Sequence, residues 1–208
     1  MQSKENLKLK IVILGPDGAG KTSVIHGLMV KFEKEGRVAK MRHLKPGVTT
    51  IRRWQGKAVV VDPHGKPQRS AILSFAKILL WLIEEWYANV FHEQKQTLLI
   101  CDRYYHDLLI DPIRYRYGGP LSIARLIGKL MPQPALWILL DAPSDVLQGR
   151  KQEVSREETE RQRRAYLAFV KEQREHRIVD ATQSLETVIA DVNHAIQCAV
   201  MQNEDSRG

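Results

Sequence analysis

The stretch Gly15-Pro16-Asp17-Gly18-Ala19-Gly20-Lys21-Thr22 decides the fold of this chain, because it matches the phosphate-binding pattern G-x-x-x-x-G-K-[ST]. The apolar run from Leu9 to Leu14 leads directly into it, and a helical pattern from Ser23 to Glu35 follows. A polyphosphate is held by several converging backbone N–H groups at the start of a helix. The order strand, loop, helix therefore favours a phosphate-binding loop over a glycine-rich turn that contains Lys-Thr by accident.

Each residue type in this loop has an expected task. The glycines let the backbone approach the phosphates, Lys21 supplies a charge for the β- and γ-phosphates, and Thr22 offers a hydroxyl to Mg²⁺. We expect the Lys21 side chain to reach solvent when no nucleotide is bound. The residues expected to contact the nucleotide are Gly15, Asp17, Gly18, Ala19, Gly20, Lys21, Thr22 and Ser23.

Composition narrows the class of protein. A chain of 208 residues has the length of one ordinary domain, so we expect residues 1–208 to form a single domain. The net charge of +8 favours polyanionic partners such as nucleotides. Aromatic residues are not interleaved with the basic ones, so we expect no nucleic-acid partner. Two cysteines and the absence of a signal-peptide core indicate a cytoplasmic protein. The apolar segment 71–83 is too short to span a membrane, and we interpret it as a buried helix.

Apolar runs alternate with helical segments along the chain. This alternation predicts an α/β fold of the P-loop NTPase type, with a five-stranded parallel sheet flanked by helices on both faces. The expected strands are 9–14, 38–44, 97–101, 136–140 and 177–179, and the expected helices are 21–35, 70–94, 119–130, 155–175 and 184–201. Residues 203–208 are expected to form a frayed tail. Residues 45–69 form a variable excursion, which is either a surface loop or a substrate-contacting segment.

A second motif follows the third expected strand. The strand 97–101 ends in Asp102-Arg103-Tyr104. Ligands of parallel sheets bind where the strands end, so Asp102 is placed to hold Mg²⁺ or its water shell, and Arg103 to clamp a phosphate. The alternative is that Asp102 only caps the following turn.

With these landmarks the chain resembles the thymidylate kinase family of P-loop nucleoside monophosphate kinases. The resemblance rests on the phosphate loop, Asp102-Arg103-Tyr104, the strand and turn Leu139-Leu140-Asp141-Ala142-Pro143, and Val179-Asp180-Ala181 with Ser184-Leu185-Glu186. It spans nearly the whole chain. It implies an ATP- and Mg²⁺-dependent kinase that works as a homodimer.

The resemblance also implies roles for single residues. Asp17 faces the sugar hydroxyl of the acceptor, Arg103 binds the acceptor phosphate, and Ala181 lies near the donor adenine. A basic lid, about 150–157, closes over the transferred phosphoryl group. Gly18 and Ala19 stand where some members carry a catalytic arginine in the loop, so the lid must supply it, and Arg150 is the candidate. We interpret Arg161, Arg163 and Arg164 as a solvated helix face paired with glutamates.

The acceptor side departs from the family pattern. Leu44-Lys45-Pro46-Gly47 stands where the family usually has Arg-Glu-Pro-Gly, and residues 78–83 lack the arginine that would face thymine. A pocket loses affinity when such partners are removed, so dTMP is a doubtful acceptor. The replacement residues lie in 104–117, where either they bind the acceptor or the tyrosines pack in the interior. The expected acceptor set is Asp17, Arg103, Tyr104, Tyr105, Asp107, Arg114 and Arg116.

Several functions remain open from the sequence. The leading one is a kinase for a nucleoside monophosphate, with Lys21, Arg103 and Arg150 as catalytic residues and Thr22 and Asp102 as metal ligands. The alternatives are a kinase for a sugar phosphate or a glycan end, and a P-loop ATPase switch acting on a protein. The helix 71–91 is apolar nearly all round, which means either deep burial or a dimer face.

Overall fold

The computed structural model describes residues 8–43, 67–92 and 97–205 of the chain. In chain order the elements are β1 (Lys8–Leu14), α1 (Lys21–Lys34), β2 (Ala39–His43), α2 (Ala71–Tyr87), the π-helical turn η1 (Ala88–His92), β3 (Thr97–Asp102), α3 (Asp107–Ile110), α4 (Leu121–Leu130), β4 (Leu136–Asp141), α5 (Ser144–Arg150), α6 (Arg156–Lys171), β5 (His176–Asp180) and α7 (Leu185–Asp205).

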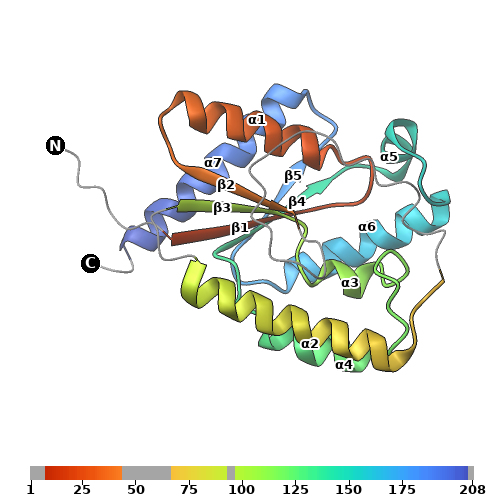
Figure 1. The fold of residues 1–208 in the computed structure, drawn as a ribbon. Coiled ribbons are helices and arrows are strands. Elements are labelled where there is room, and N and C mark those ends of the chain that lie inside the picture. Colours follow the sequence, from red (N-terminus) through yellow and green to blue (C-terminus); the bar gives the residue numbers. More distant parts are fainter. Residues whose placement is uncertain (1–7, 44–66, 93–96, 206–208) are drawn as a thin grey trace.

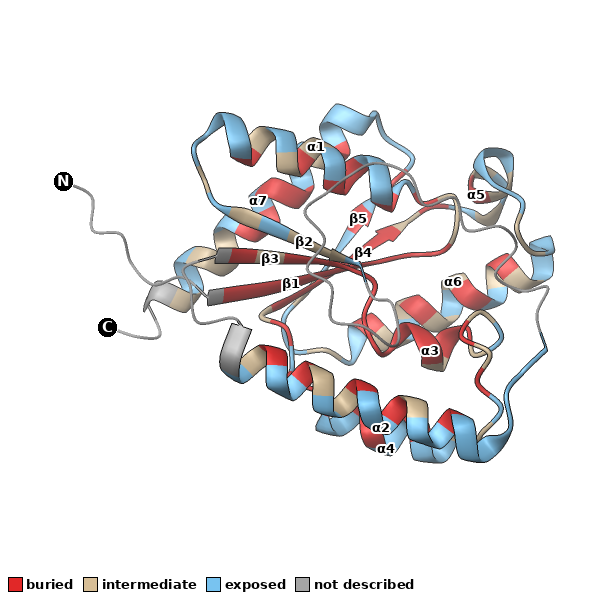
Figure 2. Ribbon diagram, viewed as in Figure 1, coloured by how far each residue is buried: buried red, intermediate tan, exposed pale blue. Residues whose placement is uncertain are grey.

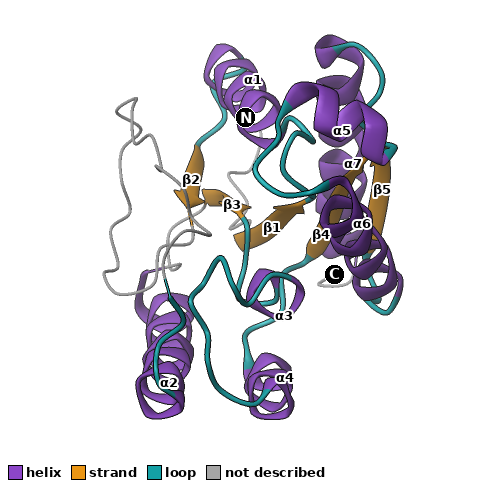
Figure 3. Ribbon diagram, turned by 90° about the vertical axis from the view of Figure 1, so that its right-hand side faces the viewer, coloured by secondary structure: helices purple, strands orange, loops and turns teal. Residues whose placement is uncertain are grey.

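The five strands form one parallel sheet in the order β2-β3-β1-β4-β5. Helices cover both faces, α1 and α7 on one and α2, α3, α4 and α6 on the other (Figure 1, Figure 3). This confirms the expected fold. All strands point the same way, so their carboxyl ends gather at one edge, where the phosphate loop leaves β1.

The alternation of side chains along β1 builds two cores. Ile11 and Ile13 face α1 and α7, whereas Val12 and Leu14 face the other layer. Because successive side chains of a strand point to opposite faces, a continuous apolar run suits a strand that is covered on both sides. The central strand is thereby fixed rigidly, and so is the start of the loop that follows it.

The element boundaries differ from the predictions in a few places. The short helices α3 and α5 were not predicted, because helices of one or two turns leave no clear periodic pattern. Helix α2 ends at Tyr87 and continues as η1, and α6 ends at Lys171 because the chain must turn before β5. Helix α7 runs to Asp205, so the expected frayed tail is wrong for 203–205. Residue 44 and most of the excursion 45–69 lie outside the described residues.

Helix α2 is not the buried helix expected from its composition. Only Ser74, Ile78, Trp81 and Glu85 of this helix are buried, while large apolar residues face outward along it and along α4 (Figure 2). The outward residues, here called the α2/α4 face, are Ile72, Leu73, Phe75, Leu79, Leu80, Ile83, Trp86, Tyr87, Ile123, Leu126 and Leu130. Deep burial within one chain is therefore excluded for α2. In the described part of the chain no helix is both long and apolar enough to cross a membrane.

Candidate active site

The phosphate loop connects β1 to α1 through a tightly packed turn. Gly18 and Gly20 both have positive φ angles, 85° and 81°. A Cβ atom on Gly18 would lie 2.4 Å from the carbonyl oxygen of Leu147 in α5, whereas a Cβ on Gly20 would meet no atom of the described residues within 4 Å. Gly18 is thus required by the packing of the protein itself. Gly20 borders open space at the start of α1, where a phosphate would bind.

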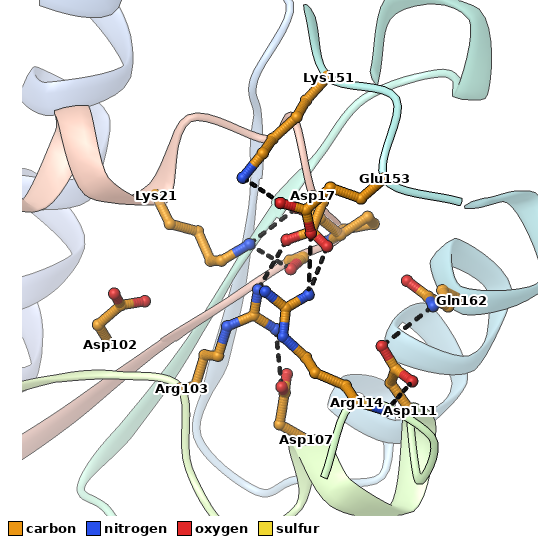
Figure 4. Close-up of polar contacts among 12 residues, drawn as sticks. Asp17, Lys21, Asp102, Arg103, Asp107, Asp111, Arg114, Lys151, Glu153 and Gln162 are labelled. Carbon is orange, nitrogen blue, oxygen red and sulfur yellow. Dashed lines mark hydrogen bonds and ion pairs between the residues drawn. The ribbon is translucent and has the colours of Figure 1, made fainter. Parts of the chain in front are cut away.

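Lys21 is turned into the loop that precedes it. Its Nζ donates hydrogen bonds to the carbonyl oxygens of Gly15, at 2.5 Å, and Pro16, at 2.8 Å (Figure 4). The residue is only 7% exposed, so the expectation that its side chain reaches solvent is wrong. Burial and the nearby charge of Arg103 lower the pKa of Lys21 to about 8. The ammonium group is therefore less firmly protonated than that of an ordinary lysine.

Thr22 and Asp102, the expected Mg²⁺ ligands, both lie at the carboxyl edge of the sheet. Thr22 and Ser23 are exposed in the first turn of α1, and Asp102 is buried at the end of β3. His43 Nδ1 lies 2.8 Å from Asp102 Oδ2, while Oδ1 has no hydrogen-bond partner among the described residues. Burial raises the pKa of Asp102, but the hydrogen bond to His43 and the nearby cations lower it more. A buried carboxylate oxygen without a partner fits a site for Mg²⁺ or its water.

Asp17 is the centre of an ion-pair network that joins distant segments. Its Oδ1 accepts a hydrogen bond from Arg103 Nη2 at 2.7 Å, and its Oδ2 accepts one from Arg114 Nη1 at 2.5 Å (Figure 4). Burial raises the pKa of Asp17, but Lys21 and Arg103 hold it well below its ordinary value. The structure thus brings together three residues that the sequence assigned to the acceptor.

Arg103 is fixed from behind by a buried carboxylate. Its Nη1 donates to Asp107 Oδ2 at 2.7 Å, and the hydroxyl groups of Tyr115 and Tyr166 donate to the same carboxylate. Asp107 is fully buried, and although burial raises its pKa, Arg103 and the two hydroxyls lower it further. Arg103 also has a positive φ of 71°, which is uncommon for a residue with a side chain. Asp107 therefore positions Arg103 and is too buried to touch an acceptor directly.

The remaining acceptor candidates lie elsewhere. Tyr104 and Tyr105 are fully buried, and their hydroxyls donate to the carbonyl oxygens of Pro132, at 2.6 Å, and Ala124, at 2.9 Å. They pack in the core, so we leave them out of the acceptor site. Arg116 donates through Nε to the carbonyl oxygen of Pro67 at 2.9 Å and makes no ion pair with the Asp17 network among the described residues.

Arg150 lies at the end of α5, beside the loop that follows β5. Its Nη1 donates to the carbonyl oxygen of Ala181 at 2.8 Å, and the N–H of Ala181 donates to the carbonyl oxygen of Asp141 at 2.8 Å. The carboxylate of Asp141 is held by Arg163 through two hydrogen bonds, of 2.8 and 2.9 Å. Arg150 therefore contacts the segment assigned to the donor base, and the description of Arg163 as a solvated residue paired with glutamate is incomplete.

The segment between α5 and α6 contacts the ion-pair network around Asp17 through Glu153. Glu153 Oε1 lies 2.5 Å from Lys151 Nζ, and Glu153 Oε2 lies 3.5 Å from Arg114 Nη1 (Figure 4). On α6 itself Arg164 pairs with Glu160, as expected for a solvated helix face, whereas Arg161 pairs with Glu158 and also donates to the carbonyl oxygen of Ile110 at 2.8 Å. The part of the lid that reaches the site is thus its connecting segment.

Comparison with known proteins identifies the family of this chain. A family model described as Thymidylate kinase matches residues 13–192. The chain belongs to the thymidylate kinase family. The thymidylate kinase of Enterococcus faecalis is 27% identical over 203 residues, covering 89% of this chain and 94% of its own length. That of Limosilactobacillus fermentum is 31% identical over 207 residues, covering 88% and 91%. As a member of the thymidylate kinase family, the chain is an ATP-dependent kinase.

Three contacts of this thymidylate kinase family member were missed from the sequence. The contact of His43 with Asp102 has a weak signal, because both residues end strands that turn out to be neighbours. The contact of Glu153 with Arg114 and that of Arg163 with Asp141 carry no local signal at all. They join residues far apart in the chain, and only the folded geometry brings them together.

Proposed function

We propose that the protein transfers the γ-phosphoryl group of ATP to a small phosphorylated acceptor, a nucleoside monophosphate. The observation that carries this proposal is the contact of Arg103 with Asp17 of the phosphate loop, at the edge where the strands end. Phosphoryl transfer depends mainly on positioning and on neutralising charge, and this edge supplies cations on both the donor and the acceptor side.

On the donor side, the loop residues and Lys21 would bind the phosphates of ATP. The hydroxyl of Thr22 and the free oxygen of Asp102 would hold Mg²⁺, which neutralises charge on the phosphates when it is bound. Lys21 would have to leave the Gly15 and Pro16 carbonyl oxygens to reach the phosphates, since its Nζ is bonded to them here. We keep Lys21 and Arg103 as the catalytic residues that touch the substrates.

Arg150 belongs with the donor in this proposal. The hydrogen bond from Arg150 to Ala181 supports this role, because Ala181 is the residue expected near the adenine, and a role at the phosphoryl group would require that bond to break. Arg150→Ala should therefore raise the KM for ATP by a larger factor than it lowers kcat. A loss confined to kcat would return Arg150 to the role of a lid arginine over the phosphoryl group.

The identity of the acceptor is the finer part of the proposal. Leu44 stands where the family usually has an arginine, and helix α2 offers no arginine to a base. Two missing contacts at ~1.5–3 kcal/mol each would lower kcat/KM for dTMP by roughly three orders of magnitude. Membership of the thymidylate kinase family favours a nucleoside monophosphate over a sugar phosphate, a glycan end or an ATPase switch.

The test is a panel of acceptors with purified protein, ATP and Mg²⁺. We expect one nucleoside monophosphate among AMP, CMP, UMP and their deoxy forms to be phosphorylated with kcat/KM above ~10⁴ M⁻¹s⁻¹, and dTMP far more slowly. A dTMP value above ~10⁵ M⁻¹s⁻¹ would make the enzyme a plain thymidylate kinase. Turnover only with sugar phosphates, or only with a protein partner, would replace the nucleotide acceptor by one of the alternatives.

We also propose that the enzyme is a cytoplasmic homodimer and that a second copy covers the α2/α4 face. Support comes from the family resemblance and from the outward apolar residues of both helices. Leu80→Glu, at a residue 58% exposed on this face, should yield a monomer in sedimentation velocity. Val38→Glu is the matched control, since Val38 is 65% exposed but precedes β2, outside this face. Equal sedimentation of Leu80→Glu and the parent protein would exclude this interface.

A further inference from the structure

Three basic residues gather where helix α2 begins, outside the network around Asp17. Arg69 precedes α2, Lys77 lies in the second turn of this helix, and Arg116 lies in the turn between α3 and α4. These three residues are here called the Arg69 cluster. Among the described residues none of them makes an ion pair with a carboxylate. The cluster is therefore a concentration of positive charge that the described part of the protein does not neutralise.

The Arg69 cluster is assembled by close backbone contacts between two segments. The N–H of Arg69 donates to the carbonyl oxygen of Arg116 at 3.0 Å, and Arg116 Nε donates to the carbonyl oxygen of Pro67 at 2.9 Å. The N–H of Gly118 donates to Ser74 Oγ at 2.9 Å. A Cβ atom on Gly118 would collide with the carbonyl oxygen of Arg69, so the two segments can pack this closely because residue 118 is glycine. The backbone thus holds both arginines near each other.

Lys77 is fixed beside the two arginines. Its Nζ donates to the carbonyl oxygen of Tyr115 at 2.7 Å and lies over the rings of Trp81 and Tyr115, 5.2 and 5.7 Å from their centroids. Burial and the neighbouring charges of Arg69 and Arg116 lower the pKa of Lys77 to about 8. An ammonium group has three N–H donors, so the bond to Tyr115 leaves two of them for a ligand.

The unused donors of the cluster suit a phosphate group. The guanidinium group of Arg69 has no hydrogen-bond partner among the described residues, and that of Arg116 uses only Nε. Arg116 also has a positive φ of 53°, and strained backbone of this kind occurs preferentially at ligand sites. A phosphate group offers several oxygens and close to two negative charges, which match the planar forks of arginine. Its binding would relieve the repulsion among the three cations.

Tyr115 connects the Arg69 cluster to the candidate active site. Its carbonyl oxygen accepts the hydrogen bond from Lys77, and its hydroxyl donates to Asp107 Oδ2 at 2.7 Å. The same carboxylate holds Arg103. Helix α2 also begins on the side of the molecule to which the strands point (Figure 1). A ligand of the cluster would therefore bind near the acceptor side.

We propose that Arg69, Lys77 and Arg116 form a binding site for a phosphate group, distinct from the phosphate loop and from the Asp17 network. This inference goes beyond the proposed function, which gives these residues no ligand. The phosphate group is either a second phosphate on the acceptor or part of a separate phosphorylated ligand. Both sources require the same chemistry, and the experiments below distinguish them.

The test is a titration with inorganic phosphate. The full-length protein is first saturated with a non-hydrolysable ATP analogue and Mg²⁺, and the backbone amide signals of Arg69 and Gly118 are followed by NMR at constant ionic strength. We expect both signals to shift in a saturable way. Arg69→Gln should weaken this binding by ~10-fold or more, because one charged partner is lost. Arg69 is exposed and only its backbone is bonded to the rest of the protein, so this variant should keep the parent's melting temperature.

Matched controls make the result specific. Arg164→Gln removes the same charge from the exposed face of α6 and should leave phosphate binding unchanged. If the two amide signals do not respond to phosphate, or if Arg69→Gln binds phosphate as the parent does, the inference is wrong while the kinase assignment stands. Binding of acetate as tightly as phosphate would overturn the phosphate class. Failure of the ATP analogue to bind would instead count against the proposed function.

Steady-state kinetics then identify the source of the phosphate group. A nucleoside monophosphate and the corresponding nucleoside bisphosphate are compared as acceptors. If the acceptor supplies the phosphate, Arg69→Gln should raise the KM of the bisphosphate by ~10-fold or more and leave that of the monophosphate unchanged. If a separate ligand supplies it, both KM values should stay unchanged in Arg69→Gln although phosphate binding is lost.

Discussion

Separate alanine substitutions should show that Gly18 is needed mainly for the stability of the fold and Gly20 mainly for nucleotide binding. Both residues have positive φ, which costs a residue with a Cβ about 1–2 kcal/mol. Part of this cost, roughly 0.4–1 kcal/mol, is offset because alanine restricts the unfolded chain. For Gly20→Ala nothing else is added, since no atom of the described residues lies within 4 Å of the new Cβ.

For Gly18→Ala a steric clash with α5 adds to this backbone cost. The Cβ would lie 2.4 Å from the Leu147 carbonyl oxygen, and this oxygen belongs to backbone that cannot rotate away. Overpacking of this kind costs about 1–3 kcal/mol. A chain of this size loses about 2–4 °C of melting temperature per kcal/mol. We therefore expect a fall of about 2–18 °C for Gly18→Ala and of at most about 6 °C for Gly20→Ala.

Nucleotide binding should be weakened more by Gly20→Ala than by Gly18→Ala. In Gly20→Ala the new methyl group enters the space beside the first turn of α1, where the phosphates are expected, so ATP affinity should fall by at least ~10-fold. Thermal unfolding followed by circular dichroism gives the stability, and calorimetric titration below the melting range gives the affinity. Unchanged ATP binding by Gly20→Ala, or a melting temperature of Gly18→Ala no lower than that of Gly20→Ala, would refute this reasoning.

Two further predictions concern ionisable groups. The pKa of Lys21 is about 8, so its amine is charged below pH 8 and loses its proton above pH 8. We expect ATP affinity to be constant below pH 8 and to fall by up to about tenfold per pH unit above pH 8. Titrations in buffers of different ionisation enthalpy would show proton uptake above pH 8, and Lys21→Met should abolish both effects. Asp107→Asn removes the charged partner of the buried Arg103 and should cost about 3–5 kcal/mol in the free energy of unfolding by urea. Asp145→Asn, which breaks the exposed pair with Arg156, should cost no more than about 1 kcal/mol; similar losses in the two variants would contradict the structural role of Asp107.

The sheet, the phosphate loop and the position of Arg103 were predictable because each depends on local patterns. A buried strand that runs into Gly-rich sequence and a helix leaves few alternatives. Which side chains after β3 face the site was not predictable. Arg103 has a left-handed backbone conformation, and this turn decides that Tyr104 and Tyr105 enter the core.

The same limit applies to the turn before α4. Arg114 and Arg116 are of the same type and two positions apart, so the sequence assigned both to the acceptor. Arg116 has a positive φ of 53°, and its side chain leads to Pro67 instead of Asp17. Backbone conformations of this kind depend on contacts with distant segments, here the bond from Arg69 N–H to the Arg116 carbonyl oxygen. No local pattern encodes them.

The network from Asp107 through Arg103, Asp17 and Arg114 to Glu153 alternates in charge along its whole length. Asp17 and Glu153 contact the same nitrogen of Arg114, so a lineage that loses this arginine is left with two carboxylates that repel each other across a partly buried space. Substitutions in this row should therefore accumulate in pairs during evolution, with a change at 114 accompanied by a neutral residue at 17 or 153. Single changes in this row would pass through a less stable intermediate, so the energetic effects of the paired changes should not be additive.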